Sequence, residues 1–169
     1  GRNAQMFWHL GLGHDLADAG YRVVLVDLRG HGGSSGEYMT FGAIETADLR
    51  QVLDELQQRG LLAEPLGVWG LSMGASIAIQ LAGADPRVDA VVAVAPYTTL
   101  REVARHQIRS YLPLWSADDA RIDALIDRAG ERAGFDPDQA DTLAAMARAT
   151  APTLIAHGDS DGVIPYEQS

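Results

Sequence analysis

The sequence predicts an α/β protein with a mostly parallel, doubly wound sheet. Two observations indicate this fold class: short continuous apolar runs rich in valine and isoleucine, and helical patterns that lie between them. Runs that stay apolar without alternating are typical of strands buried on both faces, as in a parallel sheet. Strand and helix then alternate along the chain, which is the order of a doubly wound fold.

Each predicted element rests on a local pattern. The strands are expected at residues 22–27, 67–71, 90–95 and 153–157. A first helix is expected over residues 4–19, closed by Gly20, and a largely apolar helix over residues 73–84. Residues 41–59 are predicted to form an amphipathic helix that Thr40 caps and Gly60 ends, because leucine and valine recur there at helical spacing.

The segment 98–150 interrupts this alternation. It contains no convincing strand, Ile122, Leu125 and Ile126 follow helical spacing, and another helix is expected from Asp136 to about Arg148. So long a helical insertion between buried strands is unusual for a crossover. We expect a lid over the carboxyl ends of the strands, inserted into a core of residues 1–97 and 151–169. The alternative is an enlarged crossover with no role over a site.

Composition excludes several classes of partner. The 169 residues fit one domain, and a net charge of -10 without a basic stripe argues against binding to nucleic acid or anionic membranes. The absence of cysteine excludes disulfides, cysteine-based zinc sites and a thiol nucleophile. No transmembrane stretch or signal peptide is visible, so the cytoplasm is the default expectation, although a leader could precede Gly1. The oligomeric state stays open.

The run Gly70-Leu71-Ser72-Met73-Gly74 is the motif that indicates chemistry. A G-x-S-x-G sequence between a strand and a helix forms a sharp turn that exposes the serine hydroxyl for nucleophilic attack. Gly70 and Gly74 are expected to let the strand and helix approach closely. The Met73 N–H, at the helix start, can donate to an oxyanion. The alternative is a glycine-rich turn without chemistry.

Two further loops follow predicted strands. Residues 27–34 form a glycine-rich loop in which His31 is expected to hold the loop by hydrogen bonds, since it comes too early for the Ser…Asp…His order. After the last strand, Asp159 and Asp161 both qualify as the acid that orients a catalytic histidine. Either can instead be a turn residue.

These runs, together with Ala95-Pro96-Tyr97 and residues 157–165, resemble the α/β-hydrolase superfamily, in its serine-aminopeptidase-like and dipeptidyl-aminopeptidase-like branch that includes many esterases. The resemblance covers nearly the whole chain. It implies an α/β-hydrolase fold, places the acid at Asp161 and locates a lid after the strand 90–95.

Two parts of the family's machinery have no counterpart. The histidine of a triad should follow the acid, but no histidine follows Asp161; those present are His9, His14, His31, His106 and His157. His106 is a conceivable substitute for the triad histidine, but a helix of the lid is a poor place for a base that must be held fixed. The second oxyanion donor is expected before Gly1, on a central strand whose absence would leave a gap in the sheet or force residues 22–27 to pair with 67–71. The chain is therefore expected to be truncated at both ends.

The function predicted from the sequence is a serine hydrolase that cleaves a carboxylic ester, thioester or amide through an acyl-enzyme on Ser72. Its partner is a small-molecule acyl substrate, and no metal or organic cofactor is required. Leu112, Leu114 and Trp115 either line an acyl pocket or form the lid core. The alternatives are a peptidase of the same fold and a non-catalytic binding domain that has kept the elbow.

Overall fold

The structure is a computed structural model that describes residues 9–111 and 118–168. The chain divides into two compact units, residues 1–39 and residues 40–169. In the first, helix α1 (Leu10–Asp18) ends at Ala19, and Gly20 follows at positive φ, as the sequence predicts. The start of that predicted helix at residue 4 lies outside the described residues.

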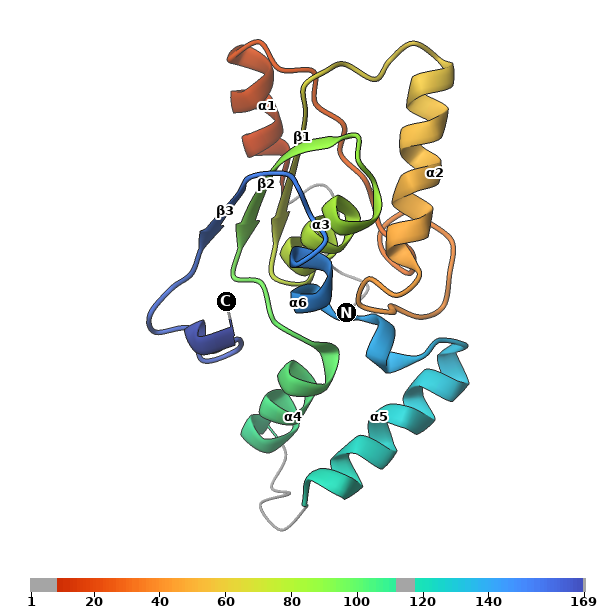
Figure 1. Cartoon of the computed structure of the whole chain (residues 1–169), viewed down its shortest axis with the longest axis vertical. Helices are drawn as coiled ribbons and strands as arrows, with labels where there is room; N and C mark the ends of the chain where they lie inside the picture. The colour runs from red at the N-terminus through yellow and green to blue at the C-terminus, as the bar shows by residue number, and fades with distance from the viewer. Residues whose placement is uncertain (1–8, 112–117, 169) are drawn as a thin grey trace. The chain divides into compact units, whose positions relative to one another are not determined.

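The second unit contains a parallel sheet of three strands in the order β1-β2-β3: β1 (Leu66–Leu71), β2 (Val88–Val94) and β3 (Thr153–Ala156). Helix α3 (Met73–Ala84) follows β1 and packs against β1 and β2, as Figure 1 shows. These strands and α3 confirm four predicted elements to within two residues at either end. Parallel pairing brings the carboxyl ends of all three strands to one edge of the sheet.

The predicted strand at residues 22–27 is wrong for the described part of the chain, where residues 21–28 form no strand. An apolar extended run becomes a strand only when a neighbouring backbone satisfies its N–H and C=O groups. Within the described residues β1 pairs only with β2.

Helix α2 (Glu45–Gln58) begins four residues later than predicted. Phe41 and Gly42 have φ of 59° and 109°, which no right-handed helix contains. The Glu45 carboxylate holds this turn, because it accepts hydrogen bonds from Thr40 N (2.7 Å), Thr40 Oγ1 (2.6 Å) and Gly42 N (2.8 Å). Thr40 Oγ1 accepts in turn from Ile44 N at 2.9 Å, so Thr40 secures the turn before the helix and is not its N-cap.

The main core lies between α3 and the sheet. Eight of the twelve residues of α3, from Ala75 to Ala82, are buried, which explains why that segment is apolar on all sides. Helix α6 (Thr142–Met146) packs on α3 (Figure 1), and a Cβ on Gly83 would lie 2.4 Å from the Ala145 carbonyl oxygen. The single helix expected from Asp136 to Arg148 is thus two pieces, a 3₁₀ turn (Pro137–Gln139) capped by Asp136 and then α6.

A second apolar cluster lies beyond the carboxyl ends of the strands. It joins the start of helix α4 (Leu100–Tyr111) to the turns that follow the strands, through Leu100 and Val103 on α4, Tyr97 after β2, Ile164 after β3, and Met73 after β1. Helix α5 (Asp119–Ala133) packs along α4. The part of segment 98–150 that stands apart from the α3 core is therefore α4 and α5, while α6 belongs to that core.

Candidate active site

Ser72 lies at the apex of the turn between β1 and α3, with φ 54° and ψ −120°. A non-glycine residue at such positive φ costs on the order of 1–3 kcal/mol, so its surroundings must hold it there. They do so through the backbone: Ser72 N donates to Val94 O at 2.7 Å, and Ser72 O accepts from Ala75 N (2.9 Å) and Ser76 N (3.2 Å). The serine is fixed to β2 on one side and to α3 on the other.

The two elbow glycines have different roles. A Cβ on Gly70 would lie 2.1 Å from the Gly74 carbonyl oxygen and 2.6 Å from Ala75 N, a clash that only a shift of the backbone can relieve. Among the described residues, a Cβ on Gly74 would meet nothing within 4 Å. The expected close approach of strand and helix is present at Gly70, and the same expectation for Gly74 is not met within that part of the chain.

Met73 occupies the first position of α3, directly after Ser72. The first N–H groups of a helix have no partner within the helix and point outward from its positive end. The Met73 side chain, half-buried, packs into the second apolar cluster with Ile164 and Val103. The donor predicted for an oxyanion is therefore on a residue whose position is set by packing as well as by the helix.

Hydrogen bonds between Ser76 of α3 and the backbone of Tyr97, which the sequence did not indicate, join α3 to the turn after β2. Ser76 Oγ accepts from Tyr97 N at 2.9 Å and lies 3.2 Å from Tyr97 O. Tyr97 is buried, and burial raises the pKa of its hydroxyl far above the ordinary value. The Phe41 carbonyl accepts from Gln80 Nε2 (3.0 Å) and from Tyr97 Oη (3.4 Å). These bonds connect the turn before α2 to α3 and to Tyr97.

Asp161 lies in the loop that follows β3, with Oδ1 accepting hydrogen bonds from Val163 N (2.8 Å) and Ile164 N (3.0 Å). These two backbone donors, with smaller contributions from the nearby imidazoles of His157 and His106, hold the pKa of the Asp161 carboxyl below its ordinary value. Asp159 is exposed, and its Oδ1 accepts from the neighbouring Ser160 hydroxyl at 3.0 Å. The loop thus fixes the orientation of one carboxylate and leaves the other at the surface.

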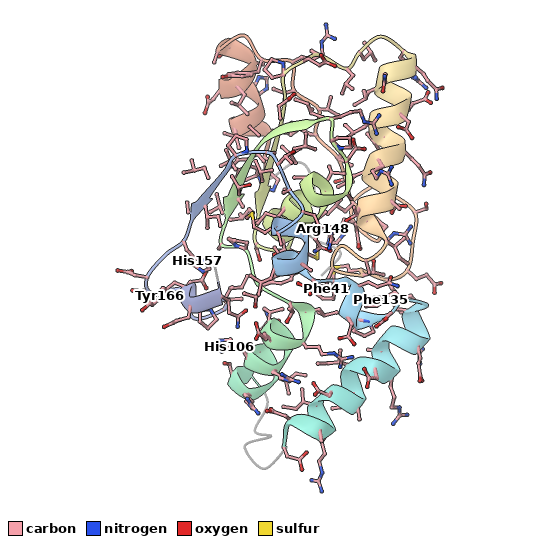
Figure 2. The ribbon with its side chains drawn as sticks, viewed as in Figure 1. Phe41, His106, Phe135, Arg148, His157 and Tyr166 are labelled. Carbon is pink, nitrogen blue, oxygen red and sulfur yellow. The ribbon has the colours of Figure 1, made fainter. Side chains whose placement is uncertain are left out.

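Two histidines contact this loop from different sides (Figure 2). His157 Nε2 lies 2.8 Å from Ile164 O and 3.8 Å from Asp161 Oδ2. His106, on α4, places Nε2 3.1 Å from Gly162 O, so it meets the loop from the helical insertion. The sequence placed His157 in the run 157–165 that follows the last strand, but gave it no role there. Nothing in the sequence placed His106 at this loop.

The glycine-rich loop of residues 27–34, in the first unit, is held by its own hydrogen bonds. Asp27 Oδ2 accepts from Gly33 N at 3.0 Å, and Ser34 Oγ donates to the Asp27 carbonyl at 2.6 Å. His31 Nδ1 lies 2.9 Å from Arg29 O, which confirms that this histidine holds the loop through hydrogen bonds. Gly32 is required at φ 48°, where a Cβ would lie 2.0 Å from Asp27 Oδ2.

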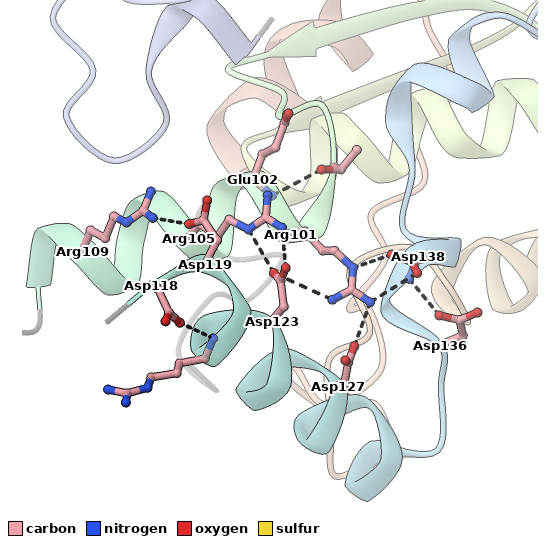
Figure 3. A network of polar contacts seen from close by, with 12 residues as sticks. Arg101, Glu102, Arg105, Arg109, Asp118, Asp119, Asp123, Asp127, Asp136 and Asp138 are labelled. Atoms are coloured by element: carbon pink, nitrogen blue, oxygen red, sulfur yellow. Dashed lines mark hydrogen bonds and ion pairs between the residues drawn. The ribbon is translucent and has the colours of Figure 1, made fainter. Parts of the chain in front are cut away.

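An ion-pair ladder joins α4 to α5 (Figure 3). Arginines recur every four residues on α4 and aspartates every four residues on the antiparallel α5, so the two charged rows face each other. The pairs are Arg109 with Asp119, Arg105 with Asp123, and Arg101 with Asp127 and with Asp138 of the 3₁₀ turn. Two four-residue periods of opposite charge were the signal in the sequence that could have predicted this helical hairpin.

The structure brings the predicted site residues of the second unit to one edge of the sheet. Gly70, Ser72 and Met73 form the turn after β1, and Asp161 lies in the loop after β3, with β2 between them. Leu112, Leu114 and Trp115 lie outside the described residues. In the part of the chain that the structure describes, no cluster of acidic or histidine side chains could bind a metal ion, and no helix is long and apolar enough to cross a membrane.

Comparison with solved structures defines the class of protein as an α/β-hydrolase fold. An esterase from Pyrococcus furiosus superposes with a TM-score of 0.70 at 24% identity, over 93% of this chain and 57% of the esterase chain. A hydrolase from Pseudomonas aeruginosa gives a TM-score of 0.63 at 24% identity, over 99% of this chain and 72% of that one. An acylaminoacyl peptidase from Pyrococcus horikoshii gives 0.59 at 16% identity, over 84% and 23%.

Sequence comparison narrows the class. The family described as Serine aminopeptidase, S33 matches residues 1–122, and the chain belongs to this family. The uncharacterized Bacillus subtilis protein YqkD is 30% identical over 92% of this chain, and human protein ABHD12B is 29% identical over 90%. The chain spans 51% and 41%, respectively, of the length of these two curated relatives.

Proposed function

We propose that the protein is a serine hydrolase that cleaves a carboxylic ester, thioester or amide through an acyl-enzyme on Ser72. The observation that carries the proposal is the backbone of the elbow, with Ser72 at φ 54° between β1 and α3 and Gly70 pressed against Gly74. A turn of this geometry exposes a serine hydroxyl at the end of a strand. Membership of the serine aminopeptidase family and the fold shared with an esterase support hydrolysis.

In the proposed reaction Ser72 Oγ attacks the substrate carbonyl carbon and passes its proton to a histidine base. The Met73 N–H stabilises the oxyanion that forms. The carbon–oxygen bond to the leaving alcohol then breaks as the base returns the proton to that oxygen, and an acyl-enzyme remains. Water hydrolyses the acyl-enzyme by the same steps in reverse order. Asp161 orients the base, to which no residue of this chain is assigned. The steps use only protein groups and water.

The helical insertion is proposed as a lid over this site. The supporting observation is that Leu100 and Val103 of α4 share one apolar cluster with Met73 of the elbow and Ile164 of the acid loop. Of the expected lid, residues 98–150, we propose that α4 and α5 form the covering part, because α6 packs in the α3 core. The proposed hydrolase core then comprises the first unit, residues 40–97, α6 and residues 151–169.

Ser72 is tested by labelling the protein in its natural full length with a fluorophosphonate probe, which reacts with activated serines. We expect the label on the parent protein and on Ser160→Ala, an exposed serine of the acid loop that serves as the control. Ser72→Ala should lose the label completely. Labelling of Ser72→Ala at the parent rate would rule out the proposal, and a parent protein that never reacts would favour the non-catalytic binding domain.

Asp161 is tested against Asp159, two residues away. We expect Asp161→Asn to lower kcat by roughly 10³–10⁴-fold, as removal of the charge that orients a catalytic histidine does. Asp159→Asn should keep kcat within about threefold of the parent, since its exposed carboxylate meets only surface groups and surface changes are small. Ester hydrolysis by the two variants makes the comparison, and equal losses in both would contradict the assignment.

Ester and peptide substrates compete within this proposal. The family's description as an aminopeptidase favours a peptidase, whereas no acidic clamp for a peptide amino terminus is identified in the sequence. We expect p-nitrophenyl esters to be hydrolysed and aminoacyl p-nitroanilides to be poor substrates. The reverse preference would select the peptidase, and a series of esters of increasing acyl length would then measure the size of the acyl pocket.

A further inference from the structure

The His157 ring closes the loop that carries Asp161. The ring is nearly buried, with a side-chain exposure of 6%, and Nε2 lies 2.8 Å from the Ile164 carbonyl oxygen. Because a carbonyl oxygen can only accept a hydrogen bond, Nε2 is the donor in this contact. The Nδ1 atom is buried and has no hydrogen-bond partner among the described residues. His157 therefore joins the first residue of the loop to its last turn.

Ile164 transmits this constraint to the carboxylate. Its carbonyl accepts from His157 and its N–H donates to Asp161 Oδ1 at 3.0 Å, so the same residue is bonded to both side chains. Ile164 is 2% exposed and belongs to the second apolar cluster, against which Met73 of the elbow packs. A residue held at its carbonyl, its N–H and its side chain has little freedom to move. Because the Ile164 N–H holds Asp161 Oδ1, the fixed position of Ile164 also fixes the orientation of the Asp161 carboxylate.

We propose that His157 is a positioning residue for the hydrolase reaction, which pins Ile164 so that Asp161 keeps Oδ1 on two backbone N–H groups and leaves Oδ2 for the catalytic base. This inference rests on the proposed function. Its chemistry is indirect, because His157 never touches the substrate. Without the ring, the loop can rotate, and misplacement of a catalytic group by about 1 Å costs on the order of 10²-fold in rate.

The position of the ring argues against a role as the base itself. Nε2 is engaged by Ile164 O, and Nδ1 is buried away from solvent. His106 offers a matched control, since its Nε2 also meets a loop carbonyl, that of Gly162 at 3.1 Å, but from the exposed side of α4. Gly162 N donates no hydrogen bond to Asp161, in contrast to Val163 and Ile164. Both imidazoles are the titratable neighbours of the Asp161 carboxylate.

The experiment uses two replacements of His157 in the full-length protein. His157→Gln keeps an amide N–H donor at a reach similar to Nε2, whereas His157→Leu fills the space without a donor. We expect His157→Leu to lower kcat by about 10–100-fold with KM changed by less than about threefold, and His157→Gln to recover most of kcat. His106→Gln should keep kcat within about threefold.

The pH profile separates positioning from packing. A misdirected Asp161 stabilises the protonated base less, so the acidic limb of kcat/KM should move to lower pH in His157→Leu and stay in place in His157→Gln. Equal kcat losses in Leu and Gln without such a movement would overturn the inference, as would full activity of His157→Leu. If His157→Leu does not fold, His157→Asn replaces it, because its shorter amide cannot reach Ile164 O.

The two proposals fail in different ways. If Ser72→Ala keeps the hydrolytic activity, the proposed function is wrong whatever the His157 variants do. If activity requires Ser72 and His157→Leu retains the parent kcat and the parent pH profile, only the positioning role is wrong. Thermal unfolding of every variant identifies those whose loss of activity reflects loss of the fold.

Discussion

At the scale of single residues, the elbow depends on one glycine. Gly70→Ala would bring a Cβ to 2.1 Å from the Gly74 carbonyl oxygen, so strand β1 and helix α3 would have to separate. We expect a loss of about 1–3 kcal/mol in the free energy of unfolding, the usual cost of overpacking, together with loss of fluorophosphonate labelling at Ser72.

Gly74→Ala is the control for that change. Its Cβ meets nothing within 4 Å in the described part of the chain, and alanine favours the helical backbone over glycine by up to about 1 kcal/mol. Urea unfolding of both variants measures the difference. A Gly74→Ala protein that is destabilised as much as Gly70→Ala would show that the two glycines are equivalent, contrary to the geometry of this turn.

At the scale of elements, the α4–α5 hairpin is held by charge as well as by its apolar cluster. Arg105 Nε and Nη2 donate to the two oxygens of Asp123 at 2.9 and 2.6 Å, and both side chains are less than a third exposed. A double-mutant cycle with Arg105→Met and Asp123→Asn should therefore give a coupling free energy near the upper end for surface pairs, about 1 kcal/mol, which decreases as salt is added.

The pair Arg59–Glu55 is the control for that cycle. It is an i,i+4 pair on α2 whose side chains are 66% and 53% exposed. Its coupling should not exceed about 0.5 kcal/mol. Measurement of both cycles at low and high ionic strength decides the point, and a coupling at Arg105–Asp123 that is zero or unaffected by salt would contradict the ladder's proposed contribution.

The elements also show what the sequence could and could not predict. The strands β1, β2 and β3 and helix α3 were predictable because uninterrupted apolar runs have few alternatives in a parallel sheet. The start of α2 was not, because a single buried carboxylate, Glu45, holds the backbone of Phe41 and Gly42 outside the helix. The extended run at residues 22–27 failed as a strand because pairing depends on a neighbour and not on local pattern.

The site divides in the same way. The turn that holds Ser72 and Met73 was predictable because it is local, between a strand and a helix that are both evident in the sequence, whereas the roles of the two residues stay predictions. The roles of His157 and His106 at the acid loop depend on how residues distant in sequence meet, as His106 and Gly162 do, and no periodicity reports such a meeting. The ion pair between Asp85 and Arg87 was also not predictable. The run Asp85-Pro86-Arg87 does not indicate that the Asp85 carboxylate is only 2% exposed.

At the scale of the whole molecule, acid should unfold the chain by protonating carboxylates that the fold keeps charged. The pKa of Asp85 is lowered from 3.8 to about 2, chiefly by the hydrogen bonds that it accepts from Arg87. The pKa values of Asp123, Asp138 and Asp161 are lowered as well. Because these groups bind protons more weakly in the folded state, their stabilisation is present above about pH 4 and is lost as the pH falls through their folded pKa values.

For Asp85 the lowered pKa corresponds to about 2 kcal/mol of stability at neutral pH. Asp85→Asn should therefore lose about this much at pH 7 and converge on the parent as the pH approaches 2. Urea unfolding at a series of pH values measures the convergence, with the exposed Asp159→Asn as the control that should follow the parent throughout. A constant gap between Asp85→Asn and the parent at every pH would contradict this account.

The middle strand has a consequence for how the site tolerates change. Ser72 N–H is bonded to the Val94 carbonyl, and Ala95 N–H to the Ala156 carbonyl, each at 2.7 Å, so the last rungs of the sheet extend toward the loops that hold the proposed nucleophile and the proposed acid. Strand β2 therefore lies between the Ser72 turn and the end of β3, and its hydrogen bonds hold both in register. A residue inserted into β1 or β3 displaces one partner, which a neighbouring loop can absorb. A residue inserted into β2 shifts the hydrogen-bond register to both neighbours at once, so the loops on both sides have to adjust.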